Sequence, residues 1–266
     1  MKAIVCVKQV PDTSGKVAVK ADGTLDRASM ATITNPDDLN ALEAALKLKD
    51  ETGCEVVVVT MGPPPAEGML RELLARGADK AVLVSGREFG GSDTFATSQI
   101  LAAAVNKIGV GPEDVVFCGR QAIDGDTAQV GPQIAEKLHL PQVTYVADIQ
   151  KDGNTLTVKR MLEDGYMMVK VQTPCLLTCI KELNTPRYLS VGGAFECYSK
   201  PLVTMTYDTL KDHELIDATT IGLKGSPTNI FKSFTPPQKG QGKMLEGADK
   251  ATCETLAAEL LKKHII

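Results

Sequence analysis

The sequence contains no tryptophan, and aromatic residues make up only 4% of its 266 residues. Proteins that bind single-stranded nucleic acid stack the bases on aromatic side chains, so this scarcity argues against such a surface. The formal net charge of −4 provides no positive field that would attract a polyanion. We therefore expect no nucleic-acid partner.

Long apolar runs are missing as well. No stretch approaches the roughly 18 residues that a membrane-spanning helix needs. The opening MKAIVCVKQV leads directly into a strand pattern, without the apolar segment and cleavage site of a secretory signal. The sequence therefore predicts a cytoplasmic protein with no membrane insertion.

Metal-binding and catalytic clusters are also absent from the pattern. The three histidines stand alone, and the seven cysteines form no C-x-x-C pair. Cys175 and Cys179 lie closest together but have no histidine near them in the sequence. Because ligand spacing of the kind found in zinc sites is missing, we predict buried free thiols and no metal.

The first half of the chain alternates between two patterns. Nearly continuous apolar runs over residues 2–9, 55–61, 80–85 and 114–119 predict parallel strands covered on both faces. Helical patterns separate them, over residues 35–53, 63–77 and 92–109. This alternation predicts a doubly wound, mostly parallel α/β sheet of the Rossmann-like type.

In such folds a ligand binds beyond the carboxyl ends of the strands, where the strand order reverses. The loops after Val7, Val59 and Phe117 are therefore the candidate site.

The second half reads differently. Strand patterns over residues 142–150, 154–162, 166–174 and 175–183, with turn residues between them, predict an antiparallel extension of the sheet. The remainder is rich in Gly, Pro, Ser and Thr until an amphipathic helix over residues 249–265. We predict a nucleotide-binding α/β domain over residues 1–200 and a C-terminal arm over residues 201–266 that packs on a partner.

The stretch GRQAIDGDTAQVGP follows the strand over residues 114–119 and precedes a helical pattern over residues 127–139. The free N–H groups and positive dipole end of that helix would face the crevice, where phosphate is the natural ligand. A well-capped helix without a ligand is the alternative. The two commonest phosphate motifs, G-x-G-x-x-G and G-x-x-x-x-G-K-[ST], do not occur.

Individual residues of this stretch have expected tasks. Asp126 or Thr127 would cap the helix, and Gly125 would let the backbone approach a ligand or adopt a positive φ. Gln121 and Gln129 would donate side-chain hydrogen bonds. The sequence FGGSDT at residues 89–94 is similar to the loop of ATP pyrophosphatase-type enzymes, but it follows the third strand instead of the first.

Four segments carry a resemblance to a known family. They are CVKQVPD at 6–12, NPDDLNALEAALKLKD at 35–50, GRQAIDGDTAQVGP at 119–132 and LNTPRYLSV at 183–191. The chain resembles, over essentially its whole length, the β subunit of electron-transfer flavoproteins. The resemblance implies an adenine-nucleotide domain in a heterodimer with an α subunit that carries a second FAD.

The resemblance also implies site residues. The nucleotide contacts would come from Cys6, Asn35, Pro36, Asp37, Asp38, Met61, Gly119, Arg120, Gln121, Ala122, Ile123, Asp124, Gly125, Asp126, Thr127, Ala128, Gln129 and Val130. Residues 183–200 would be the recognition loop that docks acyl-CoA dehydrogenases. Its contacts would come from Pro186, Arg187, Tyr188, Leu189 and Val191, with Val191 where an aliphatic anchor, often Leu, is expected.

The motif around Gly125 resembles the anaerobic, electron-bifurcating branch, whose β subunit binds FAD. That branch implies electrons passing from NADH to a low-potential acceptor, ferredoxin or flavodoxin, and through the α-subunit FAD to an acyl-CoA dehydrogenase. The flavin would supply the chemistry, so no catalytic residue is expected in this chain. Two alternatives are a non-bifurcating carrier with a structural AMP and a freestanding adenine-nucleotide-binding module.

Overall fold

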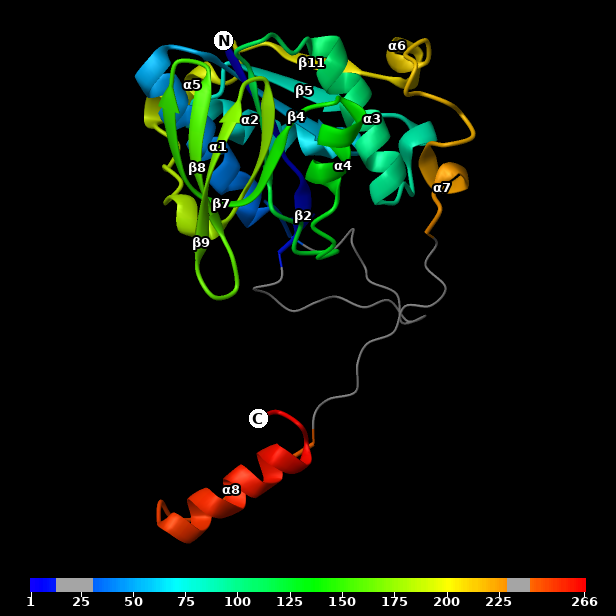
Figure 1. Cartoon of the computed structure of the whole chain (residues 1–266). Helices are drawn as coiled ribbons and strands as arrows, with labels where there is room; N and C mark the ends of the chain where they lie inside the picture. The colour runs from blue at the N-terminus through cyan, green and yellow to red at the C-terminus, as the bar shows by residue number, and fades with distance from the viewer. Residues whose placement is uncertain (13–30, 229–239) are drawn as a thin grey trace.

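A nine-stranded sheet forms the body of the computed structural model, which describes residues 1–12, 31–228 and 240–266 (Figure 1). The strand order is β11-β5-β4-β1-β6-β10-β7-β8-β9. Their bounds are β1 Lys2–Cys6, β4 Glu55–Met61, β5 Lys80–Val84, β6 Val115–Gly119, β7 Gln142–Asp152, β8 Thr155–Met161, β9 Tyr166–Gln172, β10 Cys175–Cys179 and β11 Leu202–Met205. Neighbouring strands from β11 to β7 are parallel, and β8 and β9 continue the sheet antiparallel.

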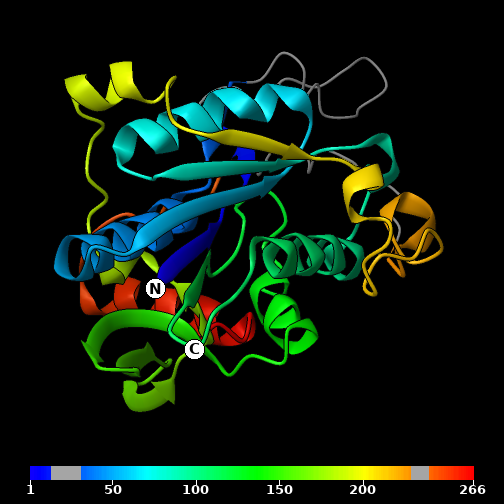
Figure 2. The same ribbon diagram turned by 90° about the horizontal axis from the view of Figure 1, so that it is seen from above.

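Helices cover both faces of the parallel strands, as Figure 2 shows from above. Helices α1 (Pro36–Thr52) and α2 (Glu67–Arg76) pack on one face, and α3 (Thr94–Ile108) and α4 (Val130–Lys137) on the other. Successive strand residues therefore enter different cores: Val5 packs with α1, and Ile4 packs with α3. The predicted doubly wound α/β fold is confirmed.

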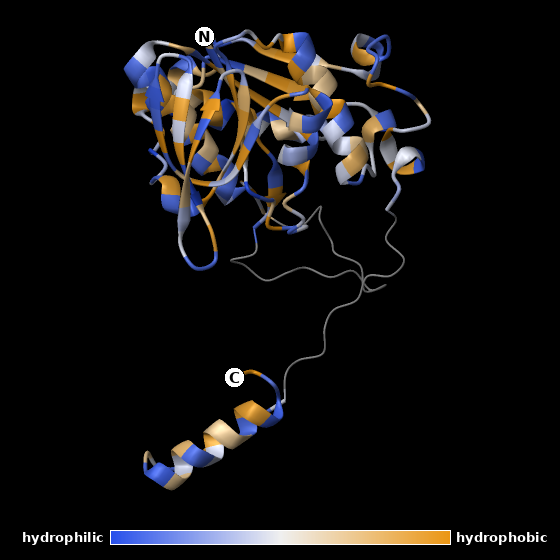
Figure 3. Ribbon diagram, in the orientation of Figure 1, coloured by the Kyte–Doolittle hydropathy of each residue, from blue (hydrophilic) through white to orange (hydrophobic). Residues whose placement is uncertain are grey.

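Burial on both faces explains the continuous apolar runs. Val56, Val57, Val58 and Val59 of β4 are all buried, and Figure 3 shows the hydrophobic colouring concentrated on the central strands. Burying one such side chain contributes about 1.5–3 kcal/mol, so these strands are a major part of the folding free energy. The sheet is thus a rigid platform for the loops at its carboxyl edge.

Helix α1 has the predicted boundaries. Pro36 occupies the first turn, where its missing N–H costs no helical hydrogen bond. The helix ends at Gly53, whose φ of 72° is left-handed and whose N–H donates to the Lys49 carbonyl. Helix α3 begins after Asp93, whose carboxylate accepts the Ala96 N–H.

The prediction for residues 175–183 is wrong in its pairing. Strand β10 lies between β6 and β7 and is parallel to both, so the antiparallel extension consists of β7, β8 and β9. All five residues of β10 are buried, as expected for a strand inside a sheet covered on both faces. The apolar sequence of β10 indicates a buried strand. It does not indicate which strands β10 pairs with, because β6 and β7 lie far from it in the sequence.

The sheet domain continues past residue 200. Strand β11 pairs with β5, and Leu210, Ile216 and Ile221 are buried in the core beside α3. The short helices α6 (Tyr207–Leu210) and α7 (Gly222–Gly225) lie in this segment. Helix α8 (Lys250–Lys262) has no buried residue, and Figure 1 shows it apart from the sheet.

Three further findings complete the description. Strands β2 (Gln9–Pro11) and β3 (Thr32–Thr34) form a separate antiparallel pair. All seven cysteines are free thiols, six buried and Cys253 exposed. Among the helices of the described residues, none is both long and apolar enough to span a bilayer.

Candidate functional site

The strand order reverses between β1 and β6, and folds of this type bind ligands at the carboxyl ends of such strands. Strands β1 and β6 are neighbours, and the chain continues from β1 towards β4 on one side and from β6 towards β7 on the other, so the two connections run in opposite directions. Loops that follow these neighbouring strands then diverge and leave room for a ligand. Cys6, Met61 and Gly119 end the three strands at this edge.

Asp38, in the first turn of α1, ties the ends of β1 and β6 together. Its Oδ2 accepts the Lys8 N–H at 2.7 Å, and its Oδ1 accepts the Gly119 N–H at 3.0 Å. Burial raises the pKa of this carboxyl to about 7, against the opposing effect of hydrogen bonds from Asn35, Lys8 and Gly119. The carboxylate therefore fixes the relative position of three elements.

Asn35 holds the loop that follows β6. Its Nδ2 donates to the Gln121 carbonyl at 2.8 Å, and its Oδ1 accepts the Ile123 N–H at 3.1 Å. Its own N–H donates to the Lys8 carbonyl at 2.9 Å. Asn35 is fully buried and makes no side-chain cap to α1, so it serves the loop instead of the helix.

Gly119 is required by a close approach. A Cβ at this position would lie 2.3 Å from Asp38 Oδ1 and 2.7 Å from the Asp37 carbonyl carbon. Those atoms belong to the first turn of α1, which cannot retreat without breaking the Asp38 hydrogen bonds. Only glycine therefore lets β6 end directly against α1.

The loop over residues 119–130 turns at Ala122, whose carbonyl accepts the N–H groups of Gly125 and Asp126. The positive φ expected at Gly125 occurs instead at Asp126 and Ala128, with values of 51° and 53°. Gly125 lies outside the left-handed region, and a Cβ there would meet nothing within 4 Å. Of the two alternatives predicted for Gly125, the positive φ is excluded, and the open space around it is compatible with the approach of a ligand.

The helix after this loop is shorter than predicted. Helix α4 begins at Val130, with Gln129 as its N-cap residue and without a side-chain cap, so the predicted start at Thr127 is wrong. The positive φ of Ala128 excludes a helix there. Neither Asp126 nor Thr127 caps α4: the Asp126 carboxylate accepts from Gln121 Nε2 at 2.8 Å.

The acidic side chains of the loop have partners. Lys8 Nζ lies 2.7 Å from Asp124 Oδ1 and 2.8 Å from Oδ2. Gln121 donates to Asp126, and Gln129 Oε1 accepts from the Thr94 hydroxyl at 3.1 Å. Lys8 lies within the apolar run over residues 2–9 and was not among the predicted site residues. Its pairing with Asp124 reduces the repulsion that this carboxylate would exert on an anionic ligand.

Two buried hydroxyls lie next to predicted site residues without a hydrogen-bond partner among the described residues. They are Oγ1 of Thr34, the residue before Asn35, and Oγ1 of Thr60, the residue before Met61. An unsatisfied buried polar atom in a native structure requires an explanation, and an absent ligand is one. Cys6 and Cys118 are paired residues of β1 and β6, and a hydrogen bond with Cys6 that stabilises the neutral thiol, together with burial, raises the pKa of Cys118.

The predicted recognition loop is held firmly on the other side of α1. The Arg187 guanidinium lies 2.9 Å from Glu43 Oε2 and 2.7 Å from Asp50 Oδ2, both on α1. Asn40 and Asn184 exchange hydrogen bonds at 2.8 and 3.0 Å. Arg187 therefore positions the loop against α1, while its side chain stays 34% exposed.

The side chains that this loop exposes are apolar. Tyr188 is 92% exposed and Val191 79%, whereas Leu189 is 44% exposed. Helix α5 (Val191–Glu196) follows and exposes Phe195 one turn after Val191. Phe195 was not among the predicted partner contacts, although its position four residues after Val191 would place both side chains on one face of a helix.

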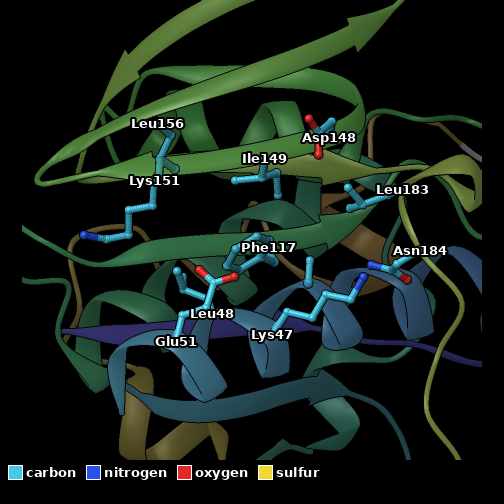
Figure 4. A pocket seen from close by; sticks show the side chains of 11 residues that line it. Lys47, Leu48, Glu51, Phe117, Asp148, Ile149, Lys151, Leu156, Leu183 and Asn184 are labelled. Carbon is cyan, nitrogen blue, oxygen red and sulfur yellow. The ribbon is translucent and has the colours of Figure 1, made fainter.

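A small cavity of about 90 Å³ lies between α1 and strands β7 and β8 (Figure 4). It is lined by Ala44, Lys47, Leu48, Glu51, Phe117, Asp148, Ile149, Lys151, Leu156, Leu183 and Asn184. None of the predicted nucleotide contacts is among them. The volume is far below the roughly 300 Å³ or more of ordinary ligand sites, so the strand-end crevice remains the candidate site.

Comparisons with known proteins agree with this geometry. The model of the electron transfer flavoprotein domain matches residues 22–205. Acryloyl-CoA reductase electron transfer subunit gamma of Anaerotignum propionicum is 68% identical, over 100% of both chains. Caffeyl-CoA reductase-Etf complex subunit CarD of Acetobacterium woodii is 52% identical, and electron transfer flavoprotein subunit beta of Clostridium acetobutylicum is 50% identical, each over 100% of both chains.

The domain match covers more than half of the chain, and the similarity to these three relatives runs from end to end. Strands β4 to β11, with Asn35, Asp38 and the loop that they hold, lie within the matched residues. The chain belongs to the electron transfer flavoprotein family and is similar throughout its length to the beta subunit.

Proposed function

We propose that this chain is the β subunit of a heterodimeric electron-transfer flavoprotein and that it binds FAD at the carboxyl ends of β1, β4 and β6. The observation that carries this proposal is the loop over residues 119–130, which Asn35 and Asp38 fix at the point where the strand order reverses. The relatives that are named as electron-transfer subunits of CoA-ester reductases support the redox role.

The residues present fit an adenine nucleotide. The hydroxyls of Thr34 and Thr60 have no hydrogen-bond partner in the described part of the chain and offer polar contacts. The exposed loop around Gly125 offers open space. The ion pair between Lys8 and Asp124 leaves less net negative charge beside a phosphate. When bound, FAD would supply hydride and single-electron chemistry, while this chain would bind and orient the nucleotide.

In the electron-bifurcating form of this function, NADH is the electron donor. The acceptors are a low-potential protein, ferredoxin or flavodoxin, and an acyl-CoA dehydrogenase that is reached through the FAD of the α subunit. The relatives named after acryloyl-CoA reductase and the caffeyl-CoA reductase-Etf complex favour this form. A non-bifurcating carrier with a structural AMP at the same site is the second candidate function.

A flavin count separates the two forms. The chain would be co-produced with an electron-transfer flavoprotein α subunit and purified as the heterodimer, and the released nucleotides would be identified by chromatography. Two FAD per heterodimer is the expected result. One FAD together with one AMP would establish the simple carrier, and no nucleotide in this chain would exclude both forms.

A further inference from the structure

The antiparallel extension contributes one unusual residue to the strand-end crevice. Tyr145 of β7 has a φ of 57°, a left-handed conformation that bulky residues rarely adopt. The pairing register of β7 shifts with respect to both neighbouring strands. The shift relative to β10 lies between Leu177 and Cys179, and the shift relative to β8 lies between Val146 and Asp148. A strained residue at a bulge is a common way of aiming a side chain at a functional site.

A hydrogen bond to β10 supports the left-handed conformation of Tyr145. The Tyr145 N–H donates to Thr178 Oγ1 at 3.3 Å, and Thr178 is buried in β10. The Tyr145 side chain nevertheless stays 40% exposed, so the strained backbone does not serve to bury the ring in the core.

Arg120, the residue after β6, lies beside this ring. The Arg120 guanidinium carbon is 6.0 Å from the Tyr145 ring centroid, and the backbone N–H of Arg120 donates to the Cys179 carbonyl. On its other side Arg120 Nε is 3.3 Å from Asp37 Oδ2, yet neither atom makes an aligned hydrogen bond within the described part of the chain. These two facing atoms are buried, whereas the Arg120 side chain as a whole is 36% exposed, so a ligand can reach the guanidinium and supply the missing hydrogen bonds.

We propose that Tyr145 belongs to the nucleotide site and that its ring, together with the Arg120 guanidinium, packs against the planar ring system of a bound phosphate-bearing nucleotide. This inference rests on the proposed function, because it places Tyr145 beside the same loop over residues 119–130. The positive charge of Arg120 suits the anionic ligand, and an aromatic face suits a heteroaromatic ring.

The test titrates the full-length chain separately with FAD, AMP and NADH. Flavin or nicotinamide fluorescence measures the dissociation constants of FAD and NADH, and calorimetry measures that of AMP. Tyr145→Asn is the informative variant, because asparagine tolerates a positive φ and removes the ring. It is expected to raise the melting temperature and to weaken at least one of the three nucleotides by roughly three- to tenfold.

Two further variants sharpen this test. Tyr145→Phe keeps the ring and should bind as the wild-type chain does. Tyr166→Asn is the matched control, because Tyr166 is also exposed on the antiparallel extension and has Lys159 Nζ 4.3 Å from its ring centroid. It should leave all three dissociation constants unchanged.

The outcome also distinguishes the ring involved. Weaker binding of AMP indicates the adenine ring, weaker binding of FAD alone indicates the flavin, and weaker binding of NADH alone indicates the nicotinamide; each supports the proposal. Equal affinities of wild-type chain and Tyr145→Asn for every nucleotide would overturn it. A wild-type chain that binds none of the three would instead overturn the proposed function.

Discussion

Gly119 and Asp38 are in direct backbone-to-carboxylate contact, with the Gly119 N–H donating to Asp38 Oδ1 at 3.0 Å. This contact joins the end of β6 to the first turn of α1. The loop over residues 119–130, which we propose binds the nucleotide, begins at the same glycine, so its starting point is set by one buried carboxylate.

Gly119→Ala should destabilise the chain and disturb the loop. The new methyl group would meet Asp38 and Asp37 well inside contact distance, and overpacking of this kind costs about 1–3 kcal/mol. Chemical denaturation measures the change. Gly125→Ala is the control, because a Cβ there meets nothing and the free energy of unfolding should change by less than about 0.5 kcal/mol. Equal losses in both variants would contradict the role of the close approach.

Asp38 should make stability depend on pH. Because the folded-state pKa is raised to about 7, the native chain holds more protons than the unfolded chain between roughly pH 4 and 7. The free energy of unfolding should therefore fall as pH rises through this window, by at most about 4 kcal/mol from this group. The raised pKa of Asp37 acts in the same direction.

Asp38→Asn removes the titratable carboxyl group. Its NH₂ group would face one of the two backbone N–H groups that Asp38 accepts, so that one hydrogen bond would be lost. The variant should be less stable than the wild-type chain at pH 4, and the difference should narrow towards pH 8. Unfolding in urea at several pH values measures both curves. Asp164→Asn, in the exposed turn between β8 and β9, controls for the loss of one carboxylate. Parallel curves for wild-type chain and Asp38→Asn would show that this group does not titrate in the window.

A charge at Gly125 should weaken nucleotide binding without unfolding the loop. Gly125→Asp fits sterically, because nothing lies within 4 Å of its Cβ, but adds a carboxylate to the proposed phosphate site. Two like unit charges about 4 Å apart in water repel each other by about 1 kcal/mol, so the binding of FAD should become up to roughly fivefold weaker. Flavin titration measures it, and the α-subunit flavin should stay bound. The neutral variant Gly125→Asn should bind FAD as tightly as the wild-type chain does. If Gly125→Asp left the FAD occupancy unchanged, the proposal that this loop contacts the phosphate would be contradicted.

Local sequence patterns predicted the parts of this fold that local physics determines. Pro36 and Gly53 set the boundaries of α1 because each fixes its own backbone conformation. The valine-rich β4 was predictable because burial on both faces requires an apolar run. Strand β10 has the same kind of sequence, but its place between β6 and β7 depends on residues about 30 to 60 positions away.

The candidate site could be proposed from the sequence, but the contacts that shape it could not. The strand alternation indicated the carboxyl edge, and the family resemblance indicated Asn35 and Asp38. Their tasks depend on backbone N–H groups of Lys8, Gly119 and Ile123, which only the folded chain brings near. The left-handed Tyr145 had no signal in the sequence, because tyrosine does not favour that conformation.

The C-terminal helix should contribute to heterodimer formation more than to the stability of the sheet domain. Leu256, Leu261 and Ile265 are all about half exposed or more, and α8 has no buried residue. Each such side chain is worth about 1.5–3 kcal/mol when fully buried, so truncation before Asp249 should weaken binding to the α subunit by roughly tenfold or more. The melting temperature of the chain alone should not change.

A point variant tests the apolar stripe of α8 without deleting it. Leu256→Asp should reproduce most of the loss of affinity, whereas Thr255→Asp places the same charge one residue away and off the stripe. Sedimentation or calorimetric titration with the α subunit compares them. Full affinity of the truncated chain would mean that this helix makes no contact with the partner.

Val191 should act as the aliphatic anchor for the acyl-CoA dehydrogenase. It is 79% exposed at the start of α5, and the loop before it is fixed by the Arg187 contacts with α1. The close packing of Gly193 against the Ala75 carbonyl of α2, where a Cβ would be 2.1 Å away, holds α5 in place. A rigidly presented apolar side chain is suited to fill a pocket on a partner.

Val191→Asp would bury an unpaired charge at that interface, so electron delivery to the dehydrogenase should become at least about tenfold slower. Flavin reduction by NADH should keep its rate, because the nucleotide site lies at the strand ends. Steady-state turnover with the dehydrogenase, measured beside single-turnover flavin reduction, separates the two steps. Val191→Leu, which restores the longer aliphatic chain, should retain or improve turnover. Loss of both activities in the aspartate variant, or of neither, would assign Val191 to a different task.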